Sequence, residues 1–140
     1  MAIERITILG STGSIGCQTL DIVERNPERF KVSSLVAHSN WQKLAEQARA
    51  FHAESVVIGN TAHYTALKEA LADTKIEVMA GEEAITHVAR SYRSDTIVNA
   101  LVGYAGLHPT AQAIESGKRI ALANKETLVV GGDIIMSAAR

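Results

Sequence analysis

Three glycines near the amino terminus have the type and spacing to bind a phosphate group. Gly10, Gly13 and Gly16 follow a short apolar run and precede a segment with helical spacing. Glycine allows a sharp turn and a close backbone approach, and the free N–H groups at a helix start attract phosphate oxygens. The pattern therefore indicates a dinucleotide-binding turn, although a glycine-rich surface turn that binds nothing is the alternative. The residues expected to contact phosphate are Thr12, Gly13, Ser14 and Ile15.

A second polar segment follows the apolar run at 32–37. It reads His38-Ser39-Asn40 and contains no carboxylate. NAD sites usually place Asp or Glu about 20 residues after the glycines, where it binds the ribose 2′-hydroxyl. A 2′-phosphate would be repelled by a carboxylate, but it can accept hydrogen bonds from Ser39 and Asn40, and His38 can add partial positive charge. The segment thus favours NADP(H) over NAD(H); a polar loop without a ligand is the alternative.

A third segment, Asn124-Lys125-Glu126, follows the apolar run at 119–123. Burying such groups is costly unless they have partners, and a ligand can supply them. We expect Asn124 and Glu126 to face the cofactor crevice and Lys125 to meet a substrate phosphate or hydroxyl. The alternative is an Asn-capped helix start with Lys125 and Glu126 in solvent.

Strand and helix patterns alternate along the whole chain, which predicts the elements that position these segments. The alternation predicts an α/β fold: a Rossmann-like, doubly wound, mostly parallel sheet with helices on both faces, in one domain spanning 1–140. The expected strands are 3–9, 32–37, 55–58, 76–79, 96–102 and 119–123. The expected helices are 14–26, one from Trp41, one capped by Thr61, 82–90, one from Pro109 to Gly117, and one from Thr127 onward.

Composition excludes several classes of function. The formal net charge of −1 gives no basic surface for nucleic acid or an anionic membrane. No apolar run approaches the roughly 20 residues of a membrane span. A single cysteine, Cys17, excludes an internal disulfide framework and fits a reducing cytosol. We see no signal or transit peptide and expect a cytoplasmic protein; the five histidines lack ligand spacing, so we expect no metal site within these residues.

Several blocks together resemble the 1-deoxy-D-xylulose 5-phosphate reductoisomerase family. They are the segment 10–16, Val102-Gly103-Tyr104-Ala105-Gly106-Leu107 with Pro109-Thr110, and Gly117-Lys118 leading to Leu122-Ala123-Asn124-Lys125-Glu126-Thr127-Leu128-Val129. The last block is the most specific. The resemblance implies an NADPH-dependent oxidoreductase of non-mevalonate isoprenoid biosynthesis, which converts 1-deoxy-D-xylulose 5-phosphate to 2-C-methyl-D-erythritol 4-phosphate with a divalent metal, Mn²⁺, Mg²⁺ or Co²⁺.

The resemblance also implies roles for individual residues. Thr12, Gly13, Ser14 and Ile15 match the phosphate-binding turn, Asn40 matches the adenosine-phosphate loop, Asn124 and Glu126 match cofactor contacts, and Lys125 matches a substrate contact. The family often has Gly followed by Arg, Lys or Ser where this chain has His38-Ser39.

The family's metal-binding Asp-Ser-Glu block and a later Glu are not among these 140 residues, and neither are its catalytic and C-terminal domains. We therefore assign no catalytic residue and no metal ligand here. We expect an N-terminal NADPH-binding domain, inactive alone, of an enzyme that forms a homodimer.

Two other hypotheses remain open. One is a free-standing NADP(H)-binding sensor or regulatory module that is complete at Arg140. The other is a different NADP-dependent reductase, such as a semialdehyde dehydrogenase, which would need a catalytic cysteine after the nucleotide domain.

Overall fold

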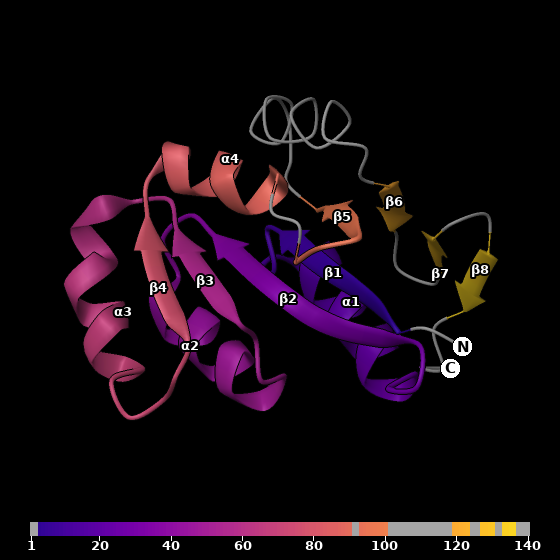
Figure 1. The fold of residues 1–140 in the computed structure, drawn as a ribbon, viewed down its shortest axis with the longest axis horizontal. Coiled ribbons are helices and arrows are strands. Elements are labelled where there is room, and N and C mark those ends of the chain that lie inside the picture. Colours follow the sequence, from indigo (N-terminus) through magenta and orange to yellow (C-terminus); the bar gives the residue numbers. More distant parts are fainter. Residues whose placement is uncertain (1–2, 91–92, 101–118, 124–126, 131–132, 137–140) are drawn as a thin grey trace.

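The computed structural model describes residues 3–90, 93–100, 119–123, 127–130 and 133–136, with side chains as far as Ala100 (Figure 1). These residues form one sheet flanked by helices. The sheet order is β4-β3-β2-β1-β5-β6-β7-β8. The strands are β1 (Glu4–Leu9), β2 (Phe30–Ala37), β3 (Ser55–Ile58), β4 (Glu77–Ala80), β5 (Thr96–Asn99), β6 (Arg119–Ala123), β7 (Thr127–Val130) and β8 (Asp133–Met136).

Six neighbouring strands of the sheet, β4, β3, β2, β1, β5 and β6, are parallel to one another, and β1 lies within this group. From β1 the chain builds outward to β2, β3 and β4 on one side, and it then crosses to β5 and β6 on the other. The order therefore reverses between β1 and β5. In open parallel sheets, ligands bind beyond the carboxyl ends of the strands at such a reversal.

Helices cover both faces of the sheet, as the sequence predicts. The helices are α1 (Ser14–Arg25), α2 (Trp41–Ala50), α3 (Tyr64–Ala70) after the 3₁₀ turn η1 (Thr61–His63), and α4 (Glu82–Arg90). One core cluster joins α1, α2 and α3 to the sheet, and a second joins α4 to it. Figure 1 shows α4 across the carboxyl ends of β3 and β4.

Side-chain alternation along the strands builds these two clusters. In β3, Val56 and Ile58 pack with α1, α2 and α3, whereas Val57 packs on the α4 side. In β1, Ile6 and Ile8 face the first cluster and Leu9 faces the second. All six side chains are 0% exposed, so these strands are buried on both faces, as parallel strands between helix layers must be.

The predicted helix from Thr127 onward is wrong. Residues 127–130 and 133–136 form β7 and β8, an antiparallel pair that extends the sheet from β6. The segments Thr127-Leu128-Val129-Val130 and Asp133-Ile134-Ile135-Met136 are rich in β-branched residues, which favour strands. The edge strand β6 offers the hydrogen-bonding partner, so tertiary pairing prevails over the helical spacing of the apolar residues.

Smaller differences concern element boundaries. Helix α1 ends at Arg25, with Asn26 as its C-cap. Asn60, not Thr61, provides the predicted cap: its side-chain Oδ1 accepts from the Ala62 backbone N–H at 3.0 Å and starts η1 rather than an α-helix. Strand β5 ends at Asn99. The predicted helix from Pro109 to Gly117 lies outside the described residues.

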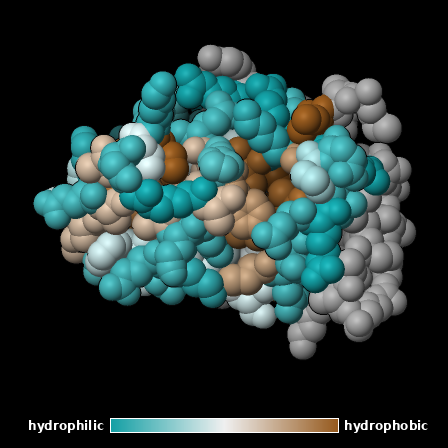
Figure 2. All heavy atoms as spheres, turned by 90° about the horizontal axis from the view of Figure 1, so that it is seen from below, coloured by the Kyte–Doolittle hydropathy of each residue, from teal (hydrophilic) through white to brown (hydrophobic). Residues whose placement is uncertain are grey.

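Figure 2 shows the molecule from below the view of Figure 1. This face is mostly hydrophilic, with a smaller apolar area. Among the side chains that the structure describes, Ile3 is the one large apolar side chain that is exposed, at 48%. None of the described helices is long and apolar enough to cross a membrane.

Candidate dinucleotide-binding site

The glycine turn lies at the reversal point of the sheet. The backbone N–H groups of Gly10 and Ser11 donate to the carbonyl oxygen of Val36 in β2, at 2.8 and 3.0 Å. On the other side, the Ala100 N–H donates to the Leu9 carbonyl oxygen at 2.8 Å. Hydrogen bonds to both neighbouring strands thus hold the turn at the carboxyl edge, where a ligand is expected.

Two of the three glycines are required by the backbone itself. Gly10 has a φ of +85°, a left-handed conformation that glycine adopts without steric cost. A Cβ on Gly16 would lie 2.1 Å from the carbonyl oxygen of Gly10 and 2.6 Å from the Cα of Ser11. Helix α1 therefore passes so close to the turn that only glycine fits at Gly16.

The start of α1 is open to a phosphate group. Gly13 is the N-cap and provides no side-chain hydrogen bond. The first N–H groups of a helix have no intrahelical partner, and they carry the positive end of the helix dipole. Gly13 and Ser14 are exposed, and Thr12 and Ile15 are half-buried. These residues fit the pyrophosphate of a dinucleotide, because an uncapped helix start at an accessible glycine leaves donors that an anion can accept from.

A side chain from α2 contacts the turn from the protein interior, a contact that the sequence reading did not predict. The Gln47 Nε2 donates to the Ser11 carbonyl oxygen at 2.9 Å. The Cys17 thiol lies beside it, 3.7 Å from the Ser11 carbonyl oxygen and 3.6 Å from that of Thr12. Gln47 lies three residues after the buried Leu44, so the only signal in the sequence is a polar residue on an apolar helix stripe.

The polar loop after β2 lies at the same edge. His38, Ser39 and Asn40 are all exposed. The Asn40 side chain accepts from the Lys43 backbone N–H at 3.2 Å and caps α2. Its amide N–H₂ group remains a potential donor to a ligand.

The loop after β3 supports this segment. The Asn60 N–H donates to the His38 carbonyl oxygen at 2.8 Å, and a Cβ on Gly59 would lie 3.1 Å from the His38 Nδ1. The loop that is predicted to read the 2′-substituent is therefore held from both ends, by the cap of α2 and by the loop after β3.

The third predicted segment, Asn124, Lys125 and Glu126, lies outside the described residues. Strand β6 ends at Ala123, immediately before it, and runs parallel to β5. The carboxyl end of β6 is therefore at the same edge of the sheet as the glycine turn. Among the described residues, no group of three or more His, Cys, Asp or Glu side chains has a geometry suited to a metal ion.

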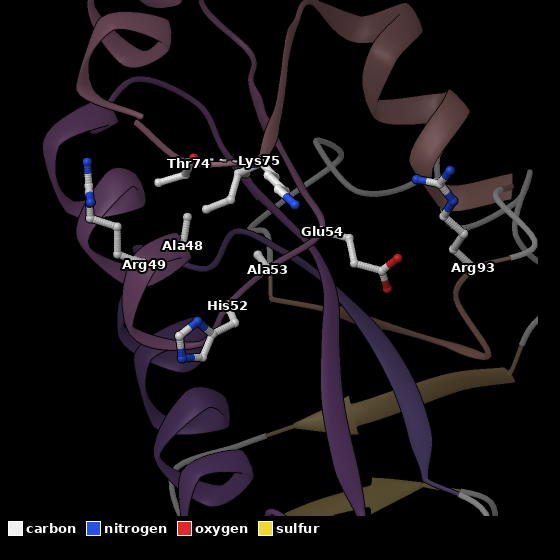
Figure 3. A pocket seen from close by; sticks show the side chains of 9 residues that line it. Ala48, Arg49, His52, Ala53, Glu54, Thr74, Lys75 and Arg93 are labelled. Atoms are coloured by element: carbon white, nitrogen blue, oxygen red, sulfur yellow. Dashed lines mark hydrogen bonds between the residues drawn. The ribbon is translucent and has the colours of Figure 1, made fainter. Parts of the chain in front are cut away.

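A separate hollow of about 560 Å³ lies at the opposite edge of the sheet. Its lining includes Ala53-Glu54 and Ile76, which directly precede β3 and β4. Figure 3 shows the side chains of Arg49 and Arg93 on opposite sides of this hollow, so the charges do not converge on one point. Arg49 is engaged by Asp73: their side-chain hydrogen bond raises the pKa of Arg49 and lowers the pKa of Asp73. We assign no ligand to this hollow.

Comparison with known proteins finds a matching family model and similar relatives. Residues 6–132 match the family model described as 1-deoxy-D-xylulose 5-phosphate reductoisomerase. The proteins of that name from Porphyromonas gingivalis and Phocaeicola vulgatus are 53% identical over 137 residues and 49% identical over 136 residues. These alignments cover 98% and 97% of this chain but 36% of each relative. The chain thus spans about a third of the length of the curated relatives it matches.

Solved structures give the same result. The reductoisomerase from Zymomonas mobilis in complex with NADPH is 42% identical with a TM-score of 0.82, over 88% of this chain and 32% of that one. A DOX-P reductoisomerase in complex with magnesium is 35% identical with a TM-score of 0.82, over 88% of this chain and 31% of that one. The α/β fold is therefore that of the corresponding part of these enzymes.

Proposed function

Because this chain belongs to the 1-deoxy-D-xylulose 5-phosphate reductoisomerase family, we propose that its residues 1–140 form the NADPH-binding domain of such an enzyme. The proposed reaction of the whole protein is the NADPH-dependent conversion of 1-deoxy-D-xylulose 5-phosphate to 2-C-methyl-D-erythritol 4-phosphate. The domain alone is inactive in this proposal, because the relatives are about three times as long.

One observation carries the proposal: an uncapped helix start directly follows a turn at the reversal point of the sheet. This geometry supplies N–H donors and a favourable dipole to an anion, and the exposed Gly13 lets a phosphate approach the backbone. A relative with 42% identity and the same fold was solved with NADPH, which supports this choice of ligand.

Each described part of the site has a task in this proposal. The backbone N–H groups of Thr12, Ser14 and Ile15 hold the pyrophosphate, and the hydroxyls of Thr12 and Ser14 can add hydrogen bonds. Bound NADPH supplies the hydride. The turn fixes the position of the dinucleotide relative to the carboxyl ends of β5 and β6, where we place its nicotinamide half.

Selectivity for the 2′-phosphate is assigned to His38, Ser39 and Asn40. All three are exposed, and they include no carboxylate that would repel the phosphate. The Ser39 hydroxyl and the Asn40 amide can donate to it. The loop after β3 holds His38 in place through the bond from the Asn60 N–H, which reduces the entropy that the loop would lose on binding.

The remaining roles rest on the family resemblance. We propose that Asn124 and Glu126 contact the cofactor and that Lys125 contacts the sugar-phosphate substrate. We also propose a divalent metal, with ligands outside these residues; a related enzyme was solved with magnesium, and Mn²⁺ or Co²⁺ would serve the same purpose. A homodimeric assembly and a cytoplasmic location complete the proposal, the latter motivated by the single cysteine.

Two experiments test this function. In the first, the 140-residue chain is titrated with NADPH and with NADH while nicotinamide fluorescence is followed. We expect NADPH to bind about tenfold more tightly or better. Equal affinities would contradict the assignment of NADPH, and a failure to bind either nucleotide would contradict a cofactor role for these residues.

The second experiment tests the reaction. The chain replaces the corresponding residues of the Porphyromonas gingivalis relative, with which it is 53% identical. We expect this chimera, supplied with magnesium, to consume NADPH when 1-deoxy-D-xylulose 5-phosphate is added, and the 140-residue chain to consume none. A folded chimera that binds NADPH but has no activity would contradict the proposed reaction. A sensor module, by contrast, would bind NADP(H) without supporting turnover in any chimera; family membership does not favour it.

A further inference from the structure

We propose that Gln47 is a positioning residue for the dinucleotide, because its side chain fixes the orientation of the peptide group between Ser11 and Thr12. This inference rests on the proposed cofactor role of the glycine turn. It assigns a part in cofactor binding to a residue of α2, outside the turn itself. The carrying observation is the 2.9 Å hydrogen bond from the Gln47 Nε2 to the Ser11 carbonyl oxygen, between residues 36 positions apart.

The geometry of the peptide group transmits this contact to the ligand side of the turn. The described residues contain no cis peptide bond. In a planar trans peptide, the carbonyl of one residue and the N–H of the next point in opposite directions. Because Gln47 holds the Ser11 carbonyl toward α2, the Thr12 N–H must point away from α2. Thr12 is one of the residues assigned to the pyrophosphate.

Backbone hydrogen bonds hold the other peptide groups of the turn. The Ser11–Thr12 peptide group is the one whose orientation depends on Gln47. The Ser11 N–H donates to Val36, the Gly13 N–H donates to Gly10 at 3.3 Å, and the Cys17 N–H donates to Gly13 at 2.9 Å. The Cys17 thiol also approaches the Ser11 carbonyl, but at 3.7 Å it is the weaker donor. Without the Gln47 amide, this peptide can rotate through coupled changes in the ψ of Ser11 and the φ of Thr12, the two soft dihedrals that flank it.

The position of Gln47 in α2 makes the contact rigid. Leu44, one turn before Gln47, and Ala48, the next residue, are both 0% exposed and hold this face of α2 against the core. The Gln47 side chain is half-buried, and its Oε1 is buried without a partner among the described residues. Burying an amide with one group unpaired is unfavourable, so a role in shaping the turn gives a reason for Gln at this position.

Two substitutions separate hydrogen bonding from packing. Gln47→Met keeps the length of the side chain and removes the donor. Gln47→Glu keeps the shape and, as a carboxylate at pH 7.5, places an acceptor against the Ser11 carbonyl. The controls are Gln42→Met, which makes the same change at an exposed position of α2, and Ala50→Glu, which adds the same negative charge at another exposed position of this helix. NADP⁺ affinity of the 140-residue chain is measured by titration calorimetry, and folding by circular dichroism.

We expect Gln47→Met to weaken NADP⁺ binding about fivefold to tenfold, as for the loss of one hydrogen bond, and Gln47→Glu to weaken it further. Both controls should bind like the unmodified chain. If Gln47 acts by shape alone, Gln47→Glu will bind normally, and the inference is overturned. If the unmodified chain itself does not bind NADP⁺, the proposed function fails instead.

A measurement without cofactor keeps the inference testable in either case. The amide signals of the turn are followed by ¹⁵N–¹H NMR in the free chain. We expect Gln47→Met to shift or broaden the Thr12 signal most strongly, because its peptide then samples two orientations, whereas Gln42→Met leaves it unchanged. An unchanged Thr12 signal in folded Gln47→Met would show that other bonds fix this peptide and would overturn the inference.

Discussion

A Cβ atom at Gly16 would lie 2.1 Å from the carbonyl oxygen of Gly10, well inside any possible contact distance. The first turn of α1 and the end of β1 are therefore in direct backbone contact. This contact aims the start of the helix at the edge of the sheet where the dinucleotide is expected, so the two glycines link the fold to its proposed function.

The first prediction concerns Gly16→Ala. The added methyl would meet backbone atoms of Gly10 and Ser11 that cannot move aside, so α1 must shift away from the sheet. We expect a loss of about 3 kcal/mol in the free energy of unfolding, or about 10 °C in the melting temperature. Circular dichroism melting measures this. A variant that melts within about 2 °C of the unmodified chain would show that the close approach is not required.

Gly13→Ala should separate stability from binding. Gly13 has extended backbone angles of φ −77° and ψ 177°, and the nearest heavy atom to an added Cβ is 3.6 Å away. Alanine therefore fits the fold, and we expect stability to change by less than about 1 kcal/mol. The methyl would occupy the approach of the pyrophosphate, so NADPH affinity should fall about tenfold or more. Normal affinity in a fluorescence titration would place the phosphates elsewhere.

Ser39→Asp should reverse the choice of nucleotide. The exposed carboxylate would repel the 2′-phosphate of NADPH and accept a hydrogen bond from the 2′-hydroxyl of NADH. We expect the ratio of the NADH and NADPH dissociation constants to fall about tenfold. Ala72→Asp is the matched control, because it adds the same charge at an exposed position after α3. If both variants change the ratio equally, the effect belongs to net charge and not to the loop after β2.

A stability prediction concerns two serines buried side by side in β2 and β3. The hydroxyls of Ser34 and Ser55 are 2.5 Å apart, and the residues are 3% and 6% exposed. Ser34→Ala would leave the Ser55 hydroxyl buried without its partner, which costs about 1–3 kcal/mol. The double variant Ser34→Ala/Ser55→Ala removes both polar groups and should be less destabilised than the sum of the single variants. Strict additivity in urea unfolding would contradict this coupling.

The sequence predicts those elements whose signals are local. Helix α4 begins and ends where its pattern places it, at Glu82 and Arg90, because acidic residues in its first turn and an apolar stripe both favour a helix there. Trp41 packs against the core, as expected for an aromatic residue at a helix start beside a sheet. The parallel sheet follows from the alternation of strands and helices.

Features that depend on tertiary partners were not predictable in the same way. Strands β7 and β8 form because β6 offers an edge for pairing: the β-branched residues of these segments favour strands, but the pairing partner is not visible in the segments themselves. The bond from Gln47 to Ser11 joins α2 to the glycine turn, and it appears only when the chain is folded. The sequence predicts Thr61 as the cap, whereas the structure has Asn60. Asn and Thr both favour the N-cap position, so the sequence does not distinguish these two adjacent residues.

The most direct test of the cofactor site is an NMR titration of the 140-residue chain with NADPH. Backbone amide shifts are recorded for every residue as the nucleotide is added. The proposed site predicts that the largest changes fall at 12–15 and 38–40, on the two loops at the carboxyl edge of the sheet. Largest changes at Arg49, Glu54 or Lys75, around the hollow at the opposite edge, would contradict the central claim that the glycine turn holds the dinucleotide.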